Sequence, residues 1–226
     1  LAAGTTEILS TTAIAVSSDG PRYGEVSPAY GQIAEPVAGT TYDFSCTTAT
    51  QAVNTAGTSR AVCTGWELRR LSDGGLIKAS SSEGEQTFSC SHTYVQGEGV
   101  ELKWRWQIQH LVTATAGDGG TVSPTSTWAV AGMSLPISAE ASNGYSFYRW
   151  NGDANSTDAE IEMTVDGPKS VKALFAIEMH VSTKEEFSTA LTEALSSIKA
   201  GDICAETIWL ADGNYQLAAK TTIDVP

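Results

Sequence analysis

Short stretches in which apolar and polar residues alternate recur along most of the chain, and this pattern predicts a protein built mainly of β-strands. The clearest stretch covers 100–107, where Val100, Leu102, Trp104 and Trp106 alternate with charged or amide side chains. Successive side chains of a strand point to opposite faces, so one face should be buried and the other wet. The two tryptophans belong to the apolar face, which favours a place in the core over the alternative of an aromatic platform for sugars.

Other alternating or β-branched stretches are separated by Gly, Asn, Asp and Ser clusters that predict turns. The strands expected from them lie at 12–16, 42–46, 61–68, 86–90, 111–114, 120–123, 134–139, 146–150, 160–165 and 170–175. Short strands at this spacing are typical of small antiparallel sheets.

Near 177 the apolar period changes from two residues to three or four, which predicts an amphipathic helix. Its apolar positions are Phe187, Ala190, Leu191, Ala194, Leu195 and Ile198. Ser182 and Glu185 have the spacing of a capping box at its start, and Gly201 is expected to end it. Beyond it we expect strands at 207–211, 215–217 and 223–225, with an Asp-Gly turn at 212–213.

A set of landmarks occurs twice along the chain. It begins with Gly-Glu-Val-Ser-Pro at 24–28 and with Gly-Thr-Val-Ser-Pro at 120–124. An Ala-Gly pair, at 38–39 and 131–132, and then a tryptophan near a glycine, at 65–66 and 150–152, follow in the same order. Near the end of each copy Val, Leu and Trp at 100, 102 and 104 correspond to Val, Ala and Phe at 171, 173 and 175. The sequence therefore predicts two copies of one strand-rich unit in series.

These landmarks resemble the divergent internalin-type B-repeat of bacterial cell-surface proteins. In the second copy the resemblance rests on 120–124, 131–132, 145–152 and 171–175. The first copy is longer, contains cysteines and places Gly65 before Trp66, so it resembles a divergent variant. The resemblance implies a β-grasp-like or small β-sheet module that spaces or displays other domains, and it brings no catalytic residues.

The end of the chain resembles the entry to a right-handed parallel β-helix of the pectate-lyase-like type. The resemblance rests on Thr-Ile-Trp-Leu at 207–210 and Asp-Gly-Asn-Tyr at 212–215, behind the predicted helix. Such a helix can cover the strand edges and apolar stack at the open end of a solenoid. We therefore expect a mainly β fold of two tandem small antiparallel β-sheet modules, at 1–109 and 110–176. A C-terminal amphipathic helix with short strands, at 177–226, would be the cap and first coil of a β-helix.

The charge of the chain narrows the classes of partner. Its 226 residues contain 13 Lys and Arg against 26 Asp and Glu, a formal net charge of -13. This balance repels phosphates and anionic headgroups, so we expect no nucleic acid partner. No stretch approaches the roughly 20 apolar residues of a membrane helix, and we expect no membrane insertion within this segment. The Leu1 start and the strand-like pattern before Pro226 suggest a processed start and a continuation of the natural protein.

Four cysteines are present, and two of them form a candidate disulfide. Cys46 ends one predicted strand and Cys63 lies in the next, with a polar hairpin loop at 47–59 between them. If these strands are antiparallel neighbours, the two sulfurs lie within bridging reach; two buried thiols are the alternative. We expect Cys90 and Cys204 to be unpaired or buried as small hydrophobic side chains. The cysteine spacings do not support a zinc site.

No pattern of polar residues points to catalysis. The oxygen-bearing side chains Asp153, Asn155 and Asp158 invite a calcium interpretation, but the EF-hand pattern is absent and a polar hairpin loop explains them. Four carboxylates lack the arrangement of an acid and base pair: Glu83, Glu85, Glu98 and Glu101. Three histidines have no neighbouring nucleophile signature and are expected at the surface or half-buried: His92, His110 and His180. We assign no catalytic residue, metal or cofactor.

We therefore expect a non-catalytic structural or interaction segment of a secreted or cell-surface bacterial protein, which spaces or displays a C-terminal β-helix and has an adhesive role. The candidate partners are an extracellular glycan or a host surface protein. The alternative is the N-terminal accessory region of a carbohydrate-active β-helix enzyme, a polysaccharide lyase or hydrolase, and it rests on fold analogy alone. A third hypothesis is direct glycan binding through an exposed aromatic such as Trp128 or Tyr148.

Overall fold

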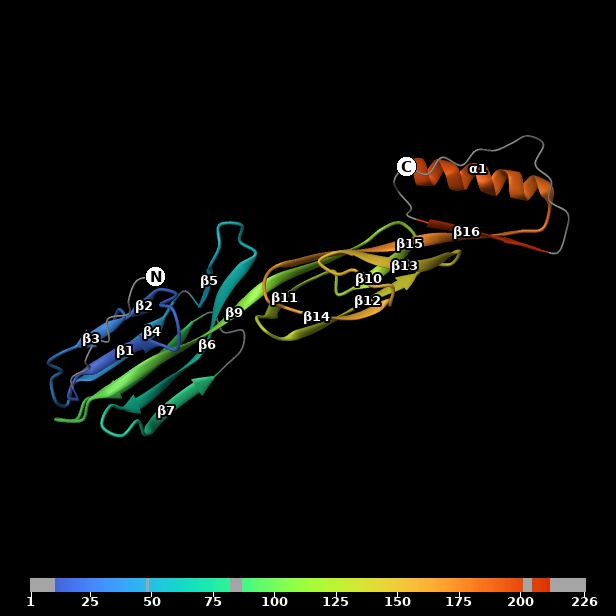
Figure 1. Ribbon diagram of the computed structural model, residues 1–226. Helices are drawn as coiled ribbons and strands as arrows, with labels where there is room; N and C mark the ends of the chain where they lie inside the picture. Colours follow the sequence, from blue (N-terminus) through green and yellow to red (C-terminus); the bar gives the residue numbers. More distant parts are fainter. Residues whose placement is uncertain (1–10, 48, 82–86, 201–204, 212–226) are drawn as a thin grey trace. The chain divides into compact units, whose positions relative to one another are not determined.

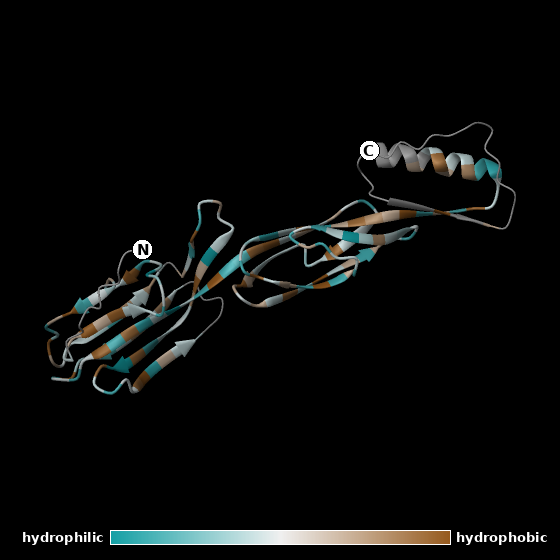
Figure 2. Ribbon diagram, viewed as in Figure 1, coloured by the Kyte–Doolittle hydropathy of each residue, from teal (hydrophilic) through white to brown (hydrophobic). Residues whose placement is uncertain are grey.

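The structure is a computed structural model that describes residues 11–47, 49–81, 87–200 and 205–211. The chain is mainly β, as the alternation in the sequence predicted (Figure 1). Hydrophobic and hydrophilic residues alternate along many of the strands (Figure 2). The chain divides into two compact units, Leu1–Gln109 (unit 1) and His110–Pro226 (unit 2).

Unit 1 is a sandwich of two sheets. One is antiparallel with the order β2-β4-β8, formed by Val26–Ser27, Thr41–Cys46 and Phe88–Thr93. The other contains β3 (Gly31–Ile33), β1 (Ile14–Ser18) and the first part of β9 (Val100–Ala116) in this order. It also contains β6 (Ser59–Arg70), which pairs with β9 and with two shorter strands, β5 (Thr50–Ala52) and β7 (Leu76–Ser81).

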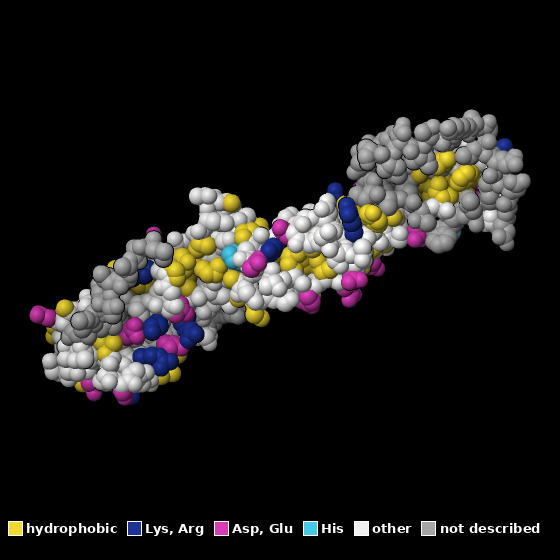
Figure 3. Space-filling model, viewed as in Figure 1, with side chains coloured by type: hydrophobic (Ala, Val, Ile, Leu, Met, Phe, Trp, Pro, Cys, Tyr) yellow, Lys and Arg dark blue, Asp and Glu magenta, His cyan; other side chains and the backbone are white. Residues whose placement is uncertain are grey.

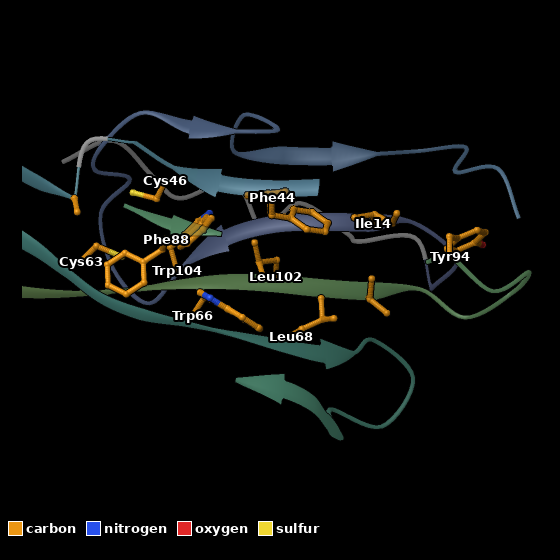
Figure 4. Packing of buried hydrophobic residues seen from close by; sticks show 13 residues of the cluster. Ile14, Phe44, Cys46, Cys63, Trp66, Leu68, Phe88, Tyr94, Leu102 and Trp104 are labelled. Carbon is orange, nitrogen blue, oxygen red and sulfur yellow. The ribbon is translucent and has the colours of Figure 1, made fainter. Parts of the chain in front are cut away.

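Side chains from both sheets fill the core of unit 1 (Figure 4). The antiparallel sheet provides Phe44, Cys46 and Phe88, and the other sheet provides Ile14, Cys63, Trp66, Leu68, Leu102 and Trp104. Leu102 and Trp104 are 0 % exposed, which confirms the buried face predicted for their strand. Trp106 on the same face is half-buried: its indole nitrogen donates to the hydroxyl of Tyr30 at 3.2 Å.

Unit 2 also pairs a three-stranded antiparallel sheet with a second sheet. The first has the order β10-β12-β14, formed by Gly120–Ser123, Ser134–Ala141 and Glu160–Thr164. The second contains β11 (Ser126–Val130), the end of β9, β15 (Lys169–Val181) and β13 (Tyr145–Gly152). Its core includes Val122, Ile137, Trp150, Val171 and Phe175, and Trp150 is 0 % exposed.

The strands of the two units follow the same order. Each unit begins with a strand that pairs in parallel with the last long strand of that unit: β1 with β9, and the end of β9 with β15. The next strand, β2 or β10, ends in a Ser-Pro step and pairs with the middle strand of the antiparallel sheet, β4 or β12. Unit 1 differs by two additional strands, β5 and β7.

The expectation of antiparallel sheets in the two modules is wrong at two strand pairs, because β1 with β9 and β9 with β15 are parallel. The pair β15 with β16 (Ala205–Leu210), in the segment expected to begin a β-helix, is also parallel. Parallel partners are joined by long connections, and the alternation within a strand carries no information about a distant partner. The strands expected at 100–107 and 111–114 form the single strand β9, because no turn-forming residue lies between them. The strands β2, β3, β5, β7 and β11 were not expected.

The end of β15 leads into a β-α-β unit. The helix α1 (Lys184–Ala200) lies between β15 and β16, which pair in parallel with Ile177 opposite Glu206. The capping box is one residue later than expected: Glu186 accepts from the backbone amide of Thr183 at 3.2 Å, and the Thr183 hydroxyl accepts from the Glu186 amide at 3.1 Å. The expected helix end at Gly201, the turn at 212–213 and the strands at 215–217 and 223–225 lie outside the described residues.

Candidate functional site

A groove of about 550 Å³ runs across β7, β6 and β9 of unit 1. Its lining residues are Thr64, Trp66, Glu67, Ala79, Ser80, Ser81 and Arg105. Gly65 allows β7 to approach this closely, because a Cβ at that position would lie 2.0 Å from the backbone oxygen of Ser80. Acidic and basic side chains gather together on one face of unit 1 (Figure 3). The groove therefore combines hydroxyl groups, one tryptophan and opposite charges.

Glu67 is the centre of the charged side of this groove. Arg69 donates to its carboxylate at 2.9 Å, and Arg105 forms a second ion pair with it. These two guanidinium groups, Arg69 first, hold the pKa of Glu67 below its usual range. Asp19 lies 3.8 Å from Arg105 and accepts from the backbone amide of Trp106 at 3.0 Å. Because the charges are already paired with each other, the groove offers fixed hydrogen-bonding groups and little net charge.

A second groove, of about 670 Å³, lies on unit 2 along the antiparallel sheet. It is lined by Ser123, Pro124, Pro136, Ile137, Ser138, Glu160, Ile161 and Glu162. The hydroxyl of Ser134 donates to Glu162 at 2.6 Å, so one of the two carboxylates already has a partner. This groove is more acidic than the first, and its apolar residues are two prolines and two isoleucines.

The candidate disulfide residues occupy the core of unit 1. Cys46 is 0 % and Cys63 is 1 % exposed, and both are thiols in the structure. They belong to β4 and β6, which lie in different sheets, so the expected arrangement of antiparallel neighbours is wrong. Cys90 is half-buried on β8, with its sulfur 3.8 Å from the backbone oxygen of Ser91. Cys204 lies outside the described residues.

The oxygen ligands considered for calcium hold a loop of unit 2 in place. Asp153 accepts from the backbone amide of Ser170 at 2.6 Å, and the backbone oxygen of Asp158 accepts from the indole of Trp150 at 3.1 Å. Within the described ranges, no three His, Cys, Asp or Glu side chains are grouped so that they could hold a metal ion. The contacts of Asp153 agree with the interpretation of a polar hairpin loop.

The other candidate polar residues are scattered. Glu101 forms a 3.5 Å ion pair with Lys103, whereas Glu83 and Glu85 lie outside the described residues. His92 is half-buried on β8, and its Nε2 has no hydrogen-bond partner among the residues that the structure describes. Burial, and then the charge of Lys78, lower the pKa of His92.

The remaining candidates also lie apart. Glu98 is exposed in the turn before β9, and His180 is exposed on β15, whereas His110 is half-buried on β9. Of the two aromatic residues considered for glycan binding, Tyr148 is 40 % exposed and Trp128 is half-buried. Neither of these two aromatics lines either groove described above.

The comparison with protein families gives one finding, on unit 2. Residues 110–178 match the Divergent InlB B-repeat domain. The B-repeat match runs from the end of β9 to Glu178 in β15 and includes the landmarks at 120–124, 150–152 and 171–175. The part of the B-repeat resemblance that concerns unit 2 is therefore confirmed. Neither the curated proteins nor the solved structures provide a match to the chain.

The groove of unit 1 was missed in the sequence, although part of its signal was present. Glu67 and Arg105 each stand among polar residues that alternate with core residues, so both could have been placed on an outer face. The two side chains come together only because β6 pairs with β9, and no local sequence motif predicts that pairing. Among the described residues, no helix is long and apolar enough to cross a membrane.

Proposed function

We propose that this chain is a non-catalytic structural and interaction segment of a bacterial cell-surface protein. The B-repeat match of residues 110–178 carries the proposal, because modules of this type are typical of bacterial surface proteins. Unit 1 acts as a second, divergent B-repeat module. Its support is the shared strand order and the Val-Ser-Pro step that ends the second strand of each unit. Two such modules in series would space or display whatever they are joined to.

The groove of unit 1 is the recognition surface in this proposal, and extracellular glycan is its ligand class. Sugar hydroxyl groups both donate and accept hydrogen bonds, and the groove offers matching groups from Glu67, Arg105, Thr64 and two serines. Trp66 contributes little surface to a ligand, because it belongs to the core and is 7 % exposed. Since Glu67 is fixed by Arg69 and Arg105, its oxygen atoms are oriented before a ligand arrives.

A glycan and polysaccharide array tests this proposal, with product release assayed on every hit. We expect binding without product release, and we expect Arg105→Ala to weaken it at least tenfold. Arg149→Ala is the matched control, because Arg149 is an exposed arginine on β13 of unit 2, outside the groove. Product release would refute the non-catalytic role, and equal binding by both variants would refute the groove as the recognition surface.

One observation favours a second candidate, an accessory region of a carbohydrate-active β-helix enzyme. The parallel pairing of β15 with β16 across α1 is the pairing that successive coils of a parallel solenoid have. In this second proposal, the helix covers the first coil and the coils that follow carry the chemistry. Cleavage of an array polysaccharide by the natural protein, together with no cleavage by residues 1–226, would favour it over the spacer role.

A further inference from the structure

Two cysteines lie in the core of unit 1, one from each sheet of the sandwich (Figure 4). We propose that Cys46 and Cys63 form a disulfide that joins the two sheets covalently. This inference is independent of the proposed function, because it concerns the covalent state of the core and not a ligand.

The path of the chain brings the two residues close together. Cys46 is the last residue of β4, and three residues later the backbone oxygen of Ala49 accepts from the amide of Cys63 at 2.7 Å. This bond holds Ala49 beside Cys63, and Cys46 lies at most about 11 Å from Ala49 along the chain, within the same core cluster. The thiol of Cys46 is also a hydrogen-bond partner of the thiol of Cys63, and this contact lowers the pKa of Cys63.

The surroundings of this pair differ from those of the third described cysteine. Both sulfurs are enclosed by the same core cluster, which includes Phe88 and Trp104, and both side chains are almost fully buried. Cys90 lies on the neighbouring strand β8 and packs against this cluster, but it is only half-buried, and burial raises the pKa of its thiol. Cys46 and Cys63 are therefore the two described cysteines that are both almost fully buried in one cluster, and we assign the oxidation to them.

The oxidant is a small or protein disulfide, and the reaction is thiol–disulfide exchange during folding, before the core closes. One cysteine thiolate attacks the donor disulfide, forms a mixed disulfide and releases one donor thiol. The thiolate of the other cysteine then attacks the sulfur of the first and releases the second donor thiol. The two cysteines lose two protons and two electrons in total, and the donor gains both. Once the core has closed, burial keeps reductants away from the bond.

This bond would connect strands that share no backbone hydrogen bonds within the described part of the chain. The β2-β4-β8 sheet and the sheet that contains β6 are separate, and side-chain packing joins them. A crosslink that closes the segment 47–62 reduces the freedom of the unfolded chain. The expected result is a melting temperature of unit 1 higher by on the order of 10 °C in the oxidised than in the reduced protein.

Refolding the full 226-residue chain in a mixture of oxidised and reduced glutathione tests the proposal. After remaining thiols are alkylated, trypsin should release the peptide 23–60 linked to the peptide 61–69, and reduction should separate them. Recovery of both peptides alkylated, or linkage of either one to the Cys90 or Cys204 peptide, would overturn the proposal.

The melting temperature of each protein with and without reductant gives a second readout. Each protein is compared only with itself, so a variant of lower stability can still be used. We expect the difference between the two melting temperatures to persist in Cys90→Ala and to disappear in the double variant Cys46→Ala, Cys63→Ala. A difference that survives in the double variant would refute the assignment even if a linked peptide were found.

Discussion

Trp150 provides the sharpest test of how unit 2 is held together. Its side chain is 0 % exposed, its ring centroid lies 5.7 Å from that of Phe147, and its indole donates to the backbone oxygen of Asp158 at 3.1 Å. Replacing a buried tryptophan by alanine costs about 3–5 kcal/mol, and the unpaired oxygen adds about 1 kcal/mol. A unit of this size has a total stability of roughly 3–10 kcal/mol. Trp150→Ala should therefore leave unit 2 close to its unfolding midpoint.

Pulse proteolysis along a urea series measures this effect, because mass spectrometry assigns each fragment to one of the two units. The unfolding midpoint of unit 2 should fall by on the order of 2 M urea or more. Tyr148→Ala is the matched control, since Tyr148 lies on the same strand and is 40 % exposed, and it should cost no more than about 0.5 kcal/mol. If both variants lowered the midpoint equally, the reasoning about the core of unit 2 would be refuted.

Three further predictions concern single positions in the two units. Gly152→Ala should cost unit 2 about 2 kcal/mol or more in urea unfolding, because its Cβ would lie 2.4 Å from the Ser170 backbone oxygen at a φ of +98°. Glu186→Gln should speed amide hydrogen exchange in the first turn of α1, since the carboxylate accepts from two backbone amides at the helix start. The lowered pKa of His92 means that the unfolded chain binds a proton more readily than the folded one, so the melting temperature of unit 1 should fall as the pH decreases below about 6.5.

Each of these predictions has a control in the same chain. Gly132→Ala adds a methyl group at a φ of +84° with no atom within 4 Å, so a loss equal to that of Gly152→Ala would contradict the close approach. Glu185→Gln removes a neighbouring charge and keeps the cap, so it should speed exchange less than Glu186→Gln does, and an equal effect would contradict the cap. His92→Gln should show a smaller fall with pH than wild type, and an unchanged pH dependence would exclude His92 as its source.

The local pattern predicted most of the long strands and not their partners. Alternation placed Leu102 and Trp104 in the core correctly, because burial of one face of a strand makes apolar and polar residues alternate along it. The parallel pairing of β1 with β9 produces no local sequence pattern, since the two strands are separated by nearly all of unit 1. The groove beside Glu67 was missed for the same reason, as its residues come from three strands.

The cysteine pair illustrates how a pair of residues can be proposed from a geometry that the structure does not have. The sequence suggested this pair because Cys46 ends one predicted strand, Cys63 lies in the next, and a polar loop joins the two strands. The structure instead places β4 and β6 in different sheets, and β5 pairs with β6 within that supposed loop. The three residues of strand β5 are all exposed, and local propensity does not separate so short a strand from a loop.

The two additional strands of unit 1 show where this type of sandwich accepts extra chain. Strand β5 lies between β4 and β6, and strand β7 lies between β6 and β8. The corresponding connections of unit 2, from β12 to β13 and from β13 to β14, contain no strand. The shorter connection of unit 2, at 142–144, is therefore suited to receive inserted peptides, whereas the connection at 153–159 holds Trp150 and packs Ala154 against the core. A protein engineer could graft a foreign epitope or an affinity tag there and use the module as a carrier scaffold.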